Sequence, residues 1–431
     1  MPGPARRTRS VVRRRLAWSV AVLSCVAVSV ALISATATAT PDARPGLATG
    51  PGWRANRDTG GAVPRGPIAD AGWLALGSVP GKGTRWEPMV RTSLLDLHQL
   101  TQPNGAVAAG AGPTWNYAWP RDTAFVAVAL ARAGHHPEAL RALRFLARVQ
   151  LADGGFEARY RLDGTGPPDH RARQSDGAGW VLWAIWEVSR SSPREQGVGS
   201  MAGLRSLLDD ATGFALAATR DGRRLPLPSP DYWEVPVRST SLGTAAPLLA
   251  GLVASRQMYD ALGQRALAER SGAAAARLRG TISERFADDY QRFGTRSLPA
   301  LRVGGGGVDA AVTFMMPPFV PSPQPKVIDA WTRYQSSARR PAGGLAPGSQ
   351  WKQDGISWTP ETALVAYTAA MSGQPEVAAR WMDWLSAHRT SWGSLPEKVL
   401  ADGAPAGPAP LAWTAALVIL TASQLETPAG Q

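Results

Sequence analysis

Residues 133–146 read AGHHPEALRALRFL, and residues 372–385 read SGQPEVAARWMDWL. In each stretch a glycine ends one apolar segment with helical spacing, and Pro-Glu begins the next. Proline is favoured in the first turn of a helix, and glutamate is favoured at the positive end of the helix dipole. Both stretches therefore predict two helices joined by a short turn. Repeated helical hairpins of this kind build solenoids or closed helical rings.

Apolar residues recur at helical spacing along most of the chain after residue 86. The predicted helices are 88–100, 122–133, 137–150, 177–190, 201–219, 240–258, 262–286, 360–371, 375–388 and 411–425. No segment of comparable length alternates like a strand. Nearly all Trp, Asp and Glu residues outside these helices lie in the connections 101–121, 151–176, 221–239, 295–322, 340–359 and 390–410. This distribution favours an all-α fold, a closed ring whose loops converge at one end.

The first 39 residues have the layout of a secretory signal, with a basic head, an apolar run from Leu16 to Ile33 and small residues in ATATAT at 35–40. The apolar run is also a marginal membrane span, so an uncleaved anchor is the alternative. Residues 40–85 are rich in Gly, Pro and Arg and are predicted to form a linker or an arm. We expect an extracellular protein, attached to a membrane only if residues 16–33 are retained.

Composition and spacing argue against several classes of function. The formal net charge is +13, but six of the positive charges are arginines in the first fifteen residues. No basic run interleaved with aromatic residues follows, so we expect no nucleic-acid partner. The only cysteine, Cys25, lies in the apolar run and leaves no thiol chemistry to the rest of the chain. The five histidines lack metal-ligand spacing and no phosphate loop occurs, so neither a metal nor a cofactor is expected.

Seventeen tryptophans are more informative than the charge. An indole offers a flat apolar face and a polar edge, which suits stacking on sugar rings. The tryptophans beside charged residues and turns are the better candidates for a cleft, namely Trp115, Trp119, Trp233, Trp358 and Trp392. Carbohydrate is therefore the expected class of ligand.

Two glutamates in turn-rich segments are candidates for acid–base chemistry. Glu234 ends DYWE (231–234), and Glu397 ends GSLPE (393–397). Hydrolysis of a glycosidic bond needs one protonated carboxyl as general acid and a second, ionised one as base or nucleophile. A carboxyl against the indole of Trp233 in a partly dry pocket would have a raised pKa, as an acid catalyst requires. Taken singly, each glutamate could equally be structural.

Four other glutamates have simpler explanations. Glu138, Glu361 and Glu376 each follow a proline at a predicted helix start, where the helix dipole favours a negative charge. Glu187 lies on the face of a predicted helix. We therefore assign these four residues structural roles.

Two motifs carry polar residues that could bind sugar hydroxyls. Arg121 and Asp122 stand at a predicted helix start and are preceded by two tryptophans, and Gln174 and Asp176 precede a tryptophan-rich helix. An arginine beside a carboxylate offers donors and an acceptor to neighbouring hydroxyls. Either aspartate could instead be a helix N-cap.

Taken together, these motifs resemble glycoside hydrolase family 15, the glucoamylase family, over about residues 86–425. The segments that carry the resemblance are NGAVAAG (104–110), WPRD (119–122), RQSDG (173–177), DYWE (231–234), GSLPE (393–397) and LAWTAALVILTA (411–422), in the family's order and approximate spacing. The resemblance implies an (α/α)6 barrel and an inverting, exo-acting α-glucosidase without a cofactor. We expect a monomer that acts on α-glucan or gluco-oligosaccharides.

The resemblance also implies roles for individual residues. Glu234 corresponds to the family's general acid and Glu397 to its general base, with the two carboxyls roughly 6.5–9.5 Å apart, as in inverting enzymes. The remaining correspondences concern sugar binding and support of the acid. Arg121 and Asp122 match the pair that grips the non-reducing terminal glucose, Trp119 would flank that glucose, and Trp233 would support the acid.

The chain departs from the family in a few places. Val235 stands where many fungal members have a second acidic residue, and His170 stands near a cleft tryptophan of some members. Residues 40–85 leave no room for the β-sandwich domain of many bacterial members. This barrel-only form is similar to the isomaltose-acting bacterial enzymes, so both α-1,4 and α-1,6 linkages are open.

Three alternatives stay open besides an α-1,4- or α-1,6-glucosidase. The first is a trehalase, an activity that also occurs in the family. The second is another (α/α)-toroid hydrolase, such as one acting on uronides. The third is a glycan-binding protein without activity, which paired carboxylates argue against because binding requires no such pair.

Overall fold

The computed structural model describes residues 67–191, 201–286, 289–294 and 306–426. All of them belong to one unit of the chain, Leu47–Gln431. The predicted signal at 1–39 and most of the predicted arm at 40–85 lie outside the described residues and stay predictions. Among the described helices, none combines the length and apolar character needed to cross a bilayer.

Six segments form a closed inner ring. They are α4 (Pro120–Arg132), α6 (Asp176–Ser191), α9 (Leu242–Ala261), the 3-10 segment η3 (Ala310–Met315), α12 (Thr359–Met371) and α14 (Ala412–Glu426). Each segment contacts the next in this order, and α14 contacts α4, which closes the ring. Their side chains are buried nearly all round, as expected for helices enclosed by other helices.

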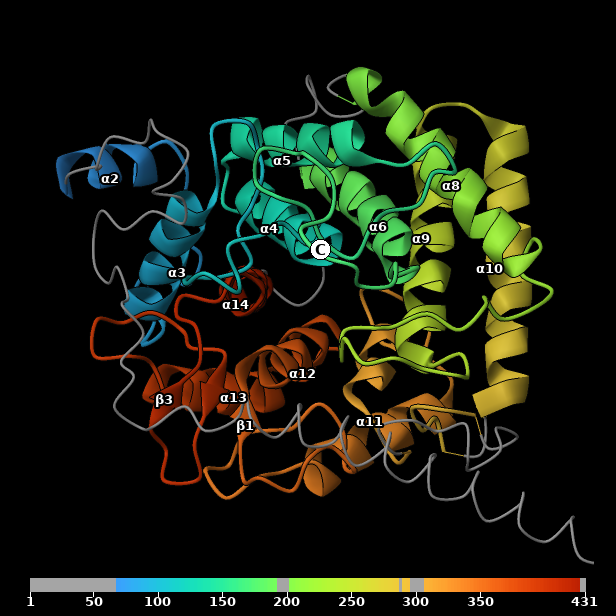
Figure 1. The fold of residues 1–431 in the computed structure, drawn as a ribbon. Coiled ribbons are helices and arrows are strands. Elements are labelled where there is room, and N and C mark those ends of the chain that lie inside the picture. Colours follow the sequence, from blue (N-terminus) through green and yellow to red (C-terminus); the bar gives the residue numbers. More distant parts are fainter. Residues whose placement is uncertain (1–66, 192–200, 287–288, 295–305, 427–431) are drawn as a thin grey trace, which may run out of the picture. The chain divides into compact units, whose positions relative to one another are not determined.

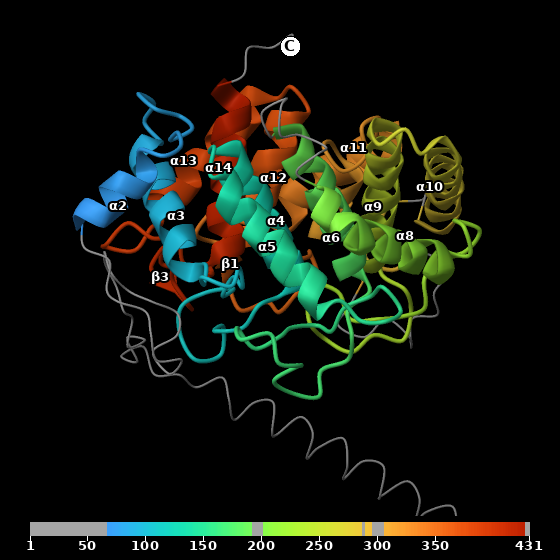
Figure 2. The ribbon, with the colours of Figure 1, turned by 90° about the horizontal axis from the view of Figure 1, so that it is seen from above.

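Six outer helices surround this ring. They are α3 (Glu87–Leu100), α5 (His136–Val149), α8 (Arg205–Thr219), α10 (Arg265–Phe286), α11 (Pro325–Ser337) and α13 (Pro375–Ala387). Each packs on an inner segment, and both views show α10 beside α9 (Figure 1, Figure 2). The outer helices bury one stripe only; α13, for example, buries Ala378, Trp381, Met382 and Leu385. The predicted (α/α)6 barrel is confirmed.

All ten predicted helices are present, with ends moved by no more than four residues. The short helix α2 (Pro67–Leu74), η3 and α11 were not predicted, and the start of the predicted helix 201–219 forms a 3-10 turn, η1 (Ala202–Leu204). Helix α2 lies in the segment predicted as an arm, and it docks through Trp73, whose ring stacks on His98 and His135 at 4.0 and 3.7 Å. A contact between residues so far apart in the chain leaves no periodic signal.

Strands are minor in the described residues. Strands β1 (Ser357–Trp358), β2 (Lys398–Val399) and β3 (Pro405–Ala406) form an antiparallel sheet in the order β1-β2-β3. In its register Trp358 lies opposite Lys398. The sheet ties the segment before α12 to the segment that leads into α14.

The inner segments all begin at the same end of the ring. The hydroxyls of Thr359 and Thr414, in the first turns of α12 and α14, lie 2.8 Å apart, and Arg121 in α4 contacts Asp176 in α6. The loops before α4, α6 and α9 gather on one side of the helices, along the lower edge of Figure 2. The predicted convergence of loops is therefore present, and it brings the candidate motifs together.

Candidate active site

Arg121 is the centre of a buried polar cluster at the first turn of α4. Its guanidinium lies 3.2 Å from the amide oxygen of Gln174 and 3.4 Å from carboxylate oxygens of both Asp122 and Asp176. The ring of Trp413 lies 4.9 Å below the guanidinium. Helix α4 has Trp119 at its N-cap position, so Asp122 is not a capping residue. Two motifs thus form one cluster, although Arg121 and Gln174 are 53 residues apart in the chain.

The two aspartates of this cluster, Asp122 and Asp176, have raised pKa values. Burial raises the pKa of Asp122 and that of Asp176 to about 6 each, against the opposing effect of the Arg121 charge. Within the described residues, Arg121 Nε and Asp176 Oδ1 are buried without a hydrogen-bond partner. Buried polar atoms are nearly always hydrogen-bonded, so these two atoms can each bond a further polar partner, a water molecule or a ligand.

Glu234 lies in a strained turn that its neighbours hold in place. Its φ of +56° is in the left-handed region, which costs a non-glycine residue about 1–3 kcal/mol. Its N–H donates to the carbonyl of Asp231 at 2.8 Å, and the Asp231 carboxylate accepts from Trp233 N–H at 3.0 Å and from the Ser241 hydroxyl at 2.6 Å. Fully buried Arg292 pairs with Asp231 at 3.0 Å and lies 3.6 Å from the Trp233 ring. Asp231 therefore anchors the turn.

The carboxyl of Glu234 has polar and charged neighbours. One oxygen accepts from the indole N–H of Trp119 and from Gln174 at 3.4 Å, and it lies 3.8 Å from Arg121. The other oxygen forms an ion pair with Arg171, whose side chain is 42% exposed. The indole N–H that donates to this carboxyl thus belongs to Trp119, whereas the ring of Trp233 packs on Arg292. The expected partly dry pocket against the Trp233 indole is a polar one instead.

The candidate tryptophans differ in what they leave uncovered. Trp119 and Trp233 are buried, with 1% and 6% of their surface exposed, so they act as supports of the site in this ligand-free state. Trp115 and Trp358 are half-buried and lie beside site residues. Trp392 is exposed, and within the described chain no ring stacking or cation–π contact joins it to these residues. Trp115 and Trp358 therefore keep more of their surface open than Trp119 and Trp233 do, although the ammonium of Lys398 lies over one face of the Trp358 ring.

Glu397 is buried beside the sheet, with 3% of its surface exposed. Its N–H donates to the carbonyl of Pro408 at 2.9 Å, and its carbonyl accepts from the N–H of Thr359 at 3.0 Å. Burial raises the pKa of Glu397, the ammonium of Lys398 at 2.9 Å opposes that rise, and the charge of Glu234 adds to it. The fold therefore places the two glutamates within electrostatic range of each other.

Glu361 is a further buried carboxyl near this site. It lies in the first turn of α12 after a proline, as predicted, but its burial was not predicted. It is 3% exposed, and burial raises its pKa to about 8, with further contributions from the charges of Glu397 and Asp309. Asp309 is also buried, accepts from the Tyr232 hydroxyl at 2.5 Å, and has a pKa raised to about 7, mainly by burial. Nothing local separates the Pro-Glu of Glu361 from that of Glu376, which is exposed. Only the position of each helix in the ring does so.

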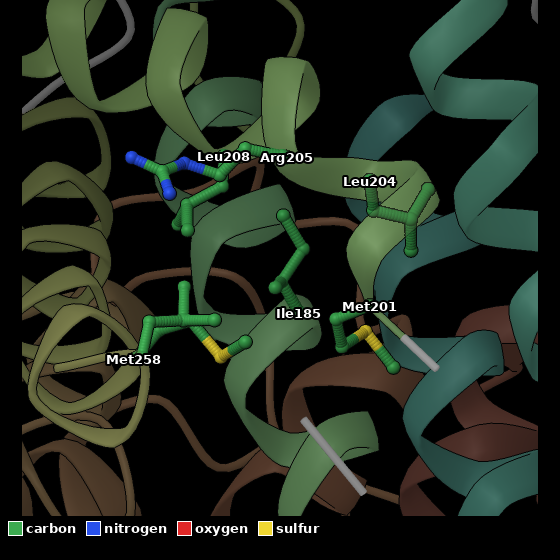
Figure 3. A pocket seen from close by; sticks show the side chains of 7 residues that line it. Ile185, Met201, Leu204, Arg205, Leu208 and Met258 are labelled. Atoms are coloured by element: carbon green, nitrogen blue, oxygen red, sulfur yellow. The ribbon is translucent and has the colours of Figure 1, made fainter. Parts of the chain in front are cut away.

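An apolar pocket lies elsewhere, between α6, α8 and α9 (Figure 3). Ile185, Leu208 and Met258 line it, and the one charged lining residue, Arg205, is paired with Asp209 at 2.8 Å. It includes none of the carboxyls described above. Within the described part of the chain, no group of three His, Cys, Asp or Glu side chains is placed to hold a metal ion.

Comparisons with known proteins support the fold. No protein family's sequence profile matches the chain. An uncharacterized glycosyl hydrolase of Methanocaldococcus jannaschii is 29% identical over 99 residues, which are 22% of this chain and 16% of that protein. This match spans only a small part of the relative.

Two solved structures resemble the barrel over most of its length. A glycosidase variant in complex with glucose aligns with a TM-score of 0.65 at 20% identity, over 78% of this chain and 96% of that one. A bacterial glucoamylase complexed with acarbose aligns with a TM-score of 0.67 at 18% identity, over 82% of this chain and 57% of that one. At these identities the likeness establishes the fold.

Proposed function

We propose that this protein is an inverting, exo-acting α-glucoside hydrolase that releases glucose from the non-reducing ends of α-gluco-oligosaccharides. The observation that carries the proposal is that Glu234 and Glu397 lie within electrostatic range of each other, with Glu234 3.8 Å from Arg121. A protein that only binds glycans has no need of two interacting carboxyls. A hydrolase needs one to give a proton and one to accept a proton.

The surroundings of the two carboxyls suit two different roles, that of a general acid and that of a general base. Glu234 is partly exposed and would donate a proton to the glycosidic oxygen as the bond from that oxygen to C1 breaks. Glu397 would accept a proton from the water that attacks C1 from the opposite face, so that a C1–OH bond forms with inverted configuration. Arg171 contacts Glu234 in the ligand-free state, and the leaving oxygen of the substrate would take its place.

The Arg121 cluster would bind the terminal sugar. Arg121, Asp122 and Asp176 present buried donors and acceptors on one side of Glu234, and hydroxyls of a glucose ring would complete their hydrogen bonds. The relatives' names point the same way, since the similar structures include a glucoamylase with acarbose and a glycosidase with glucose. A sugar held there by its non-reducing end would be cut one residue at a time.

A hydrolysis panel tests this function. The purified protein should release glucose from maltose, isomaltose or longer dextrins, and proton NMR early in turnover should show β-glucose as the first product because the attack inverts C1. Preference within the panel decides between α-1,4 and α-1,6 linkages. A trehalose-only activity would replace the proposal with a trehalase.

Two results would contradict it outright. Initial release of α-glucose would remove the inverting mechanism. Binding of these sugars without hydrolysis, measured by calorimetry alongside the panel, would leave a glycan-binding protein instead.

A further inference from the structure

Lys398 is held between an indole and the carboxylate of Glu397. The register of the β1-β2-β3 sheet places Lys398 opposite Trp358, and its ammonium lies 4.4 Å from the centre of the Trp358 ring. The same ammonium is 2.9 Å from Glu397 Oε2. The side chain is 29% exposed, so it reaches the buried carboxylate from the edge of the site. The chain has only four lysines among its 46 basic residues, and one of them is placed here.

The surroundings of Glu397 disfavour the ionised form of its carboxyl. Its side chain is only 4% exposed, and it lies within electrostatic range of two other carboxyls, Glu234 and Glu361. Within the described residues, its Oε2 has no conventional hydrogen bond. A buried carboxylate without a positive partner takes up a proton instead of staying charged. Lys398 is the cation in contact with it.

The backbone of Gly407 also lies against this carboxylate, next to the Lys398 side chain. Gly407 has a φ of +72°, and a Cβ built on it would lie 2.9 Å from Glu397 Oε2. A side chain at position 407 would therefore push the carboxylate away. Gly407 and Lys398 both lie against Oε2 and together restrict where the carboxylate of Glu397 can lie.

We propose that Lys398 is a positioning residue, whose ammonium keeps the buried carboxylate of Glu397 ionised and aimed so that it can accept the proton of the attacking water. It acts through Glu397 and not on the sugar. This inference rests on the proposed function, because it concerns the base of that reaction. A lysine suits the role, since its compact charge can meet one carboxylate oxygen while Trp358 holds the group in place.

The test is the pH profile of kcat/KM for Lys398→Met on the best substrate of the panel. Glu397 must be ionised to act, and loss of a contacting positive charge raises the pKa of a carboxyl. The acidic limb should therefore move to higher pH by about one pH unit or more, with activity recovering as the pH rises. KM should stay within about twofold, because the lysine does not touch the sugar. Lys398→Arg should restore most of the wild-type limb.

Lys352→Met is the matched control. Lys352 also lies over an indole, 5.7 Å from the Trp351 ring centre, but no ion pair joins it to Glu397. Its removal should leave the acidic limb where it is. Circular dichroism of each variant verifies that it is folded, and Lys398→Gln serves if the methionine variant is not.

The outcomes separate the two proposals. An active wild-type enzyme whose acidic limb is the same in Lys398→Met and Lys398→Gln overturns the role of Lys398 and leaves the proposed function intact. A raised KM with an unmoved limb shows that Lys398 contacts the sugar, which also overturns it. A wild-type protein that is inert on the whole panel overturns the proposed function itself.

Discussion

The two glutamates of the site differ in what their neighbours supply. Glu234 receives an indole N–H and an arginine at an open edge, on a backbone turn that Asp231 fixes. Glu397 is enclosed, with one lysine against it and little contact with solvent. The general acid must be accessible to the leaving group of the substrate. The general base must stay ionised although it is buried. These surroundings match the two roles.

Glutamine variants of both residues test these roles. Glu234→Gln and Glu397→Gln keep size and polarity but cannot transfer the proton, so each should lower kcat by about 10²–10⁴-fold. Glu376→Gln is the control, because this glutamate also follows a proline in a first helical turn but is exposed. Steady-state kinetics on the best substrate is the measurement. Turnover close to wild type in either site variant would take that residue out of the mechanism.

Among the elements, the crossing of α6 and α9 sets the spacing of the site. Gly179 in α6 lies against the backbone of α9, where a Cβ on it would come 2.1 Å from the carbonyl oxygen of Pro247. Gly251 of α9 lies against Gly179 in turn. Helix α6 starts at Asp176, three residues before this crossing. A close approach of the two helices therefore holds Asp176 beside the turn that carries Glu234.

Gly179→Ala should consequently be destabilising. The added methyl group would force the backbones of α6 and α9 apart. We therefore expect the free energy of unfolding to fall by about 1–3 kcal/mol or more. Gly213→Ala in α8 is the matched control, because Gly213 is helical, exposed and has no atom within 4 Å of the added Cβ. That change should stabilise by up to about 1 kcal/mol. Thermal unfolding of both variants measures the difference, and equal melting temperatures would show that the crossing is looser than described.

At the scale of the whole molecule, the ring gathers several carboxyls into a dry interior. Asp122 and Asp176 have a pKa of about 6, Asp309 of about 7 and Glu361 of about 8, and burial is the largest cause in each case. A carboxyl with a raised pKa keeps its proton in the folded chain at a pH where the unfolded chain has released it. Stability therefore falls as the pH rises through that window.

Glu361→Gln measures this effect. The ordinary pKa of a glutamate is 4.5 and that of Glu361 is about 8, so the wild-type protein should lose stability between about pH 5 and pH 8. The glutamine variant should lose less, by an amount on the order of a few kcal/mol at pH 8. Melting temperatures across this range, with Glu376→Gln as the exposed control, provide the comparison. Parallel curves for wild type and Glu361→Gln would mean that Glu361 titrates normally.

Helix positions were predictable because their signal is local. Ten helices were located from Pro-Glu at their starts, glycine at their ends and the 3.6-residue spacing of apolar residues. The segment η3 was not predicted, because a six-residue 3-10 turn followed by Pro317 and Pro318 shows no hydrophobic period. The polar motifs were found in the same way, from residue types beside turns. Lys398 and Glu361 were not, since their roles depend on which segments lie next to them.

The sequence by itself determined that this chain forms a ring of helical hairpins whose loops carry two glutamates and an Arg-Asp pair. Hydrophobic period and turn chemistry suffice for that, because both act between neighbours in the chain. Only the tertiary structure decided which carboxyls are buried, which cation meets each one, and which tryptophans stay uncovered. Those properties depend on dielectric surroundings and on interactions between residues far apart in the chain, such as Glu234 and Glu397, which are separated by 163 positions.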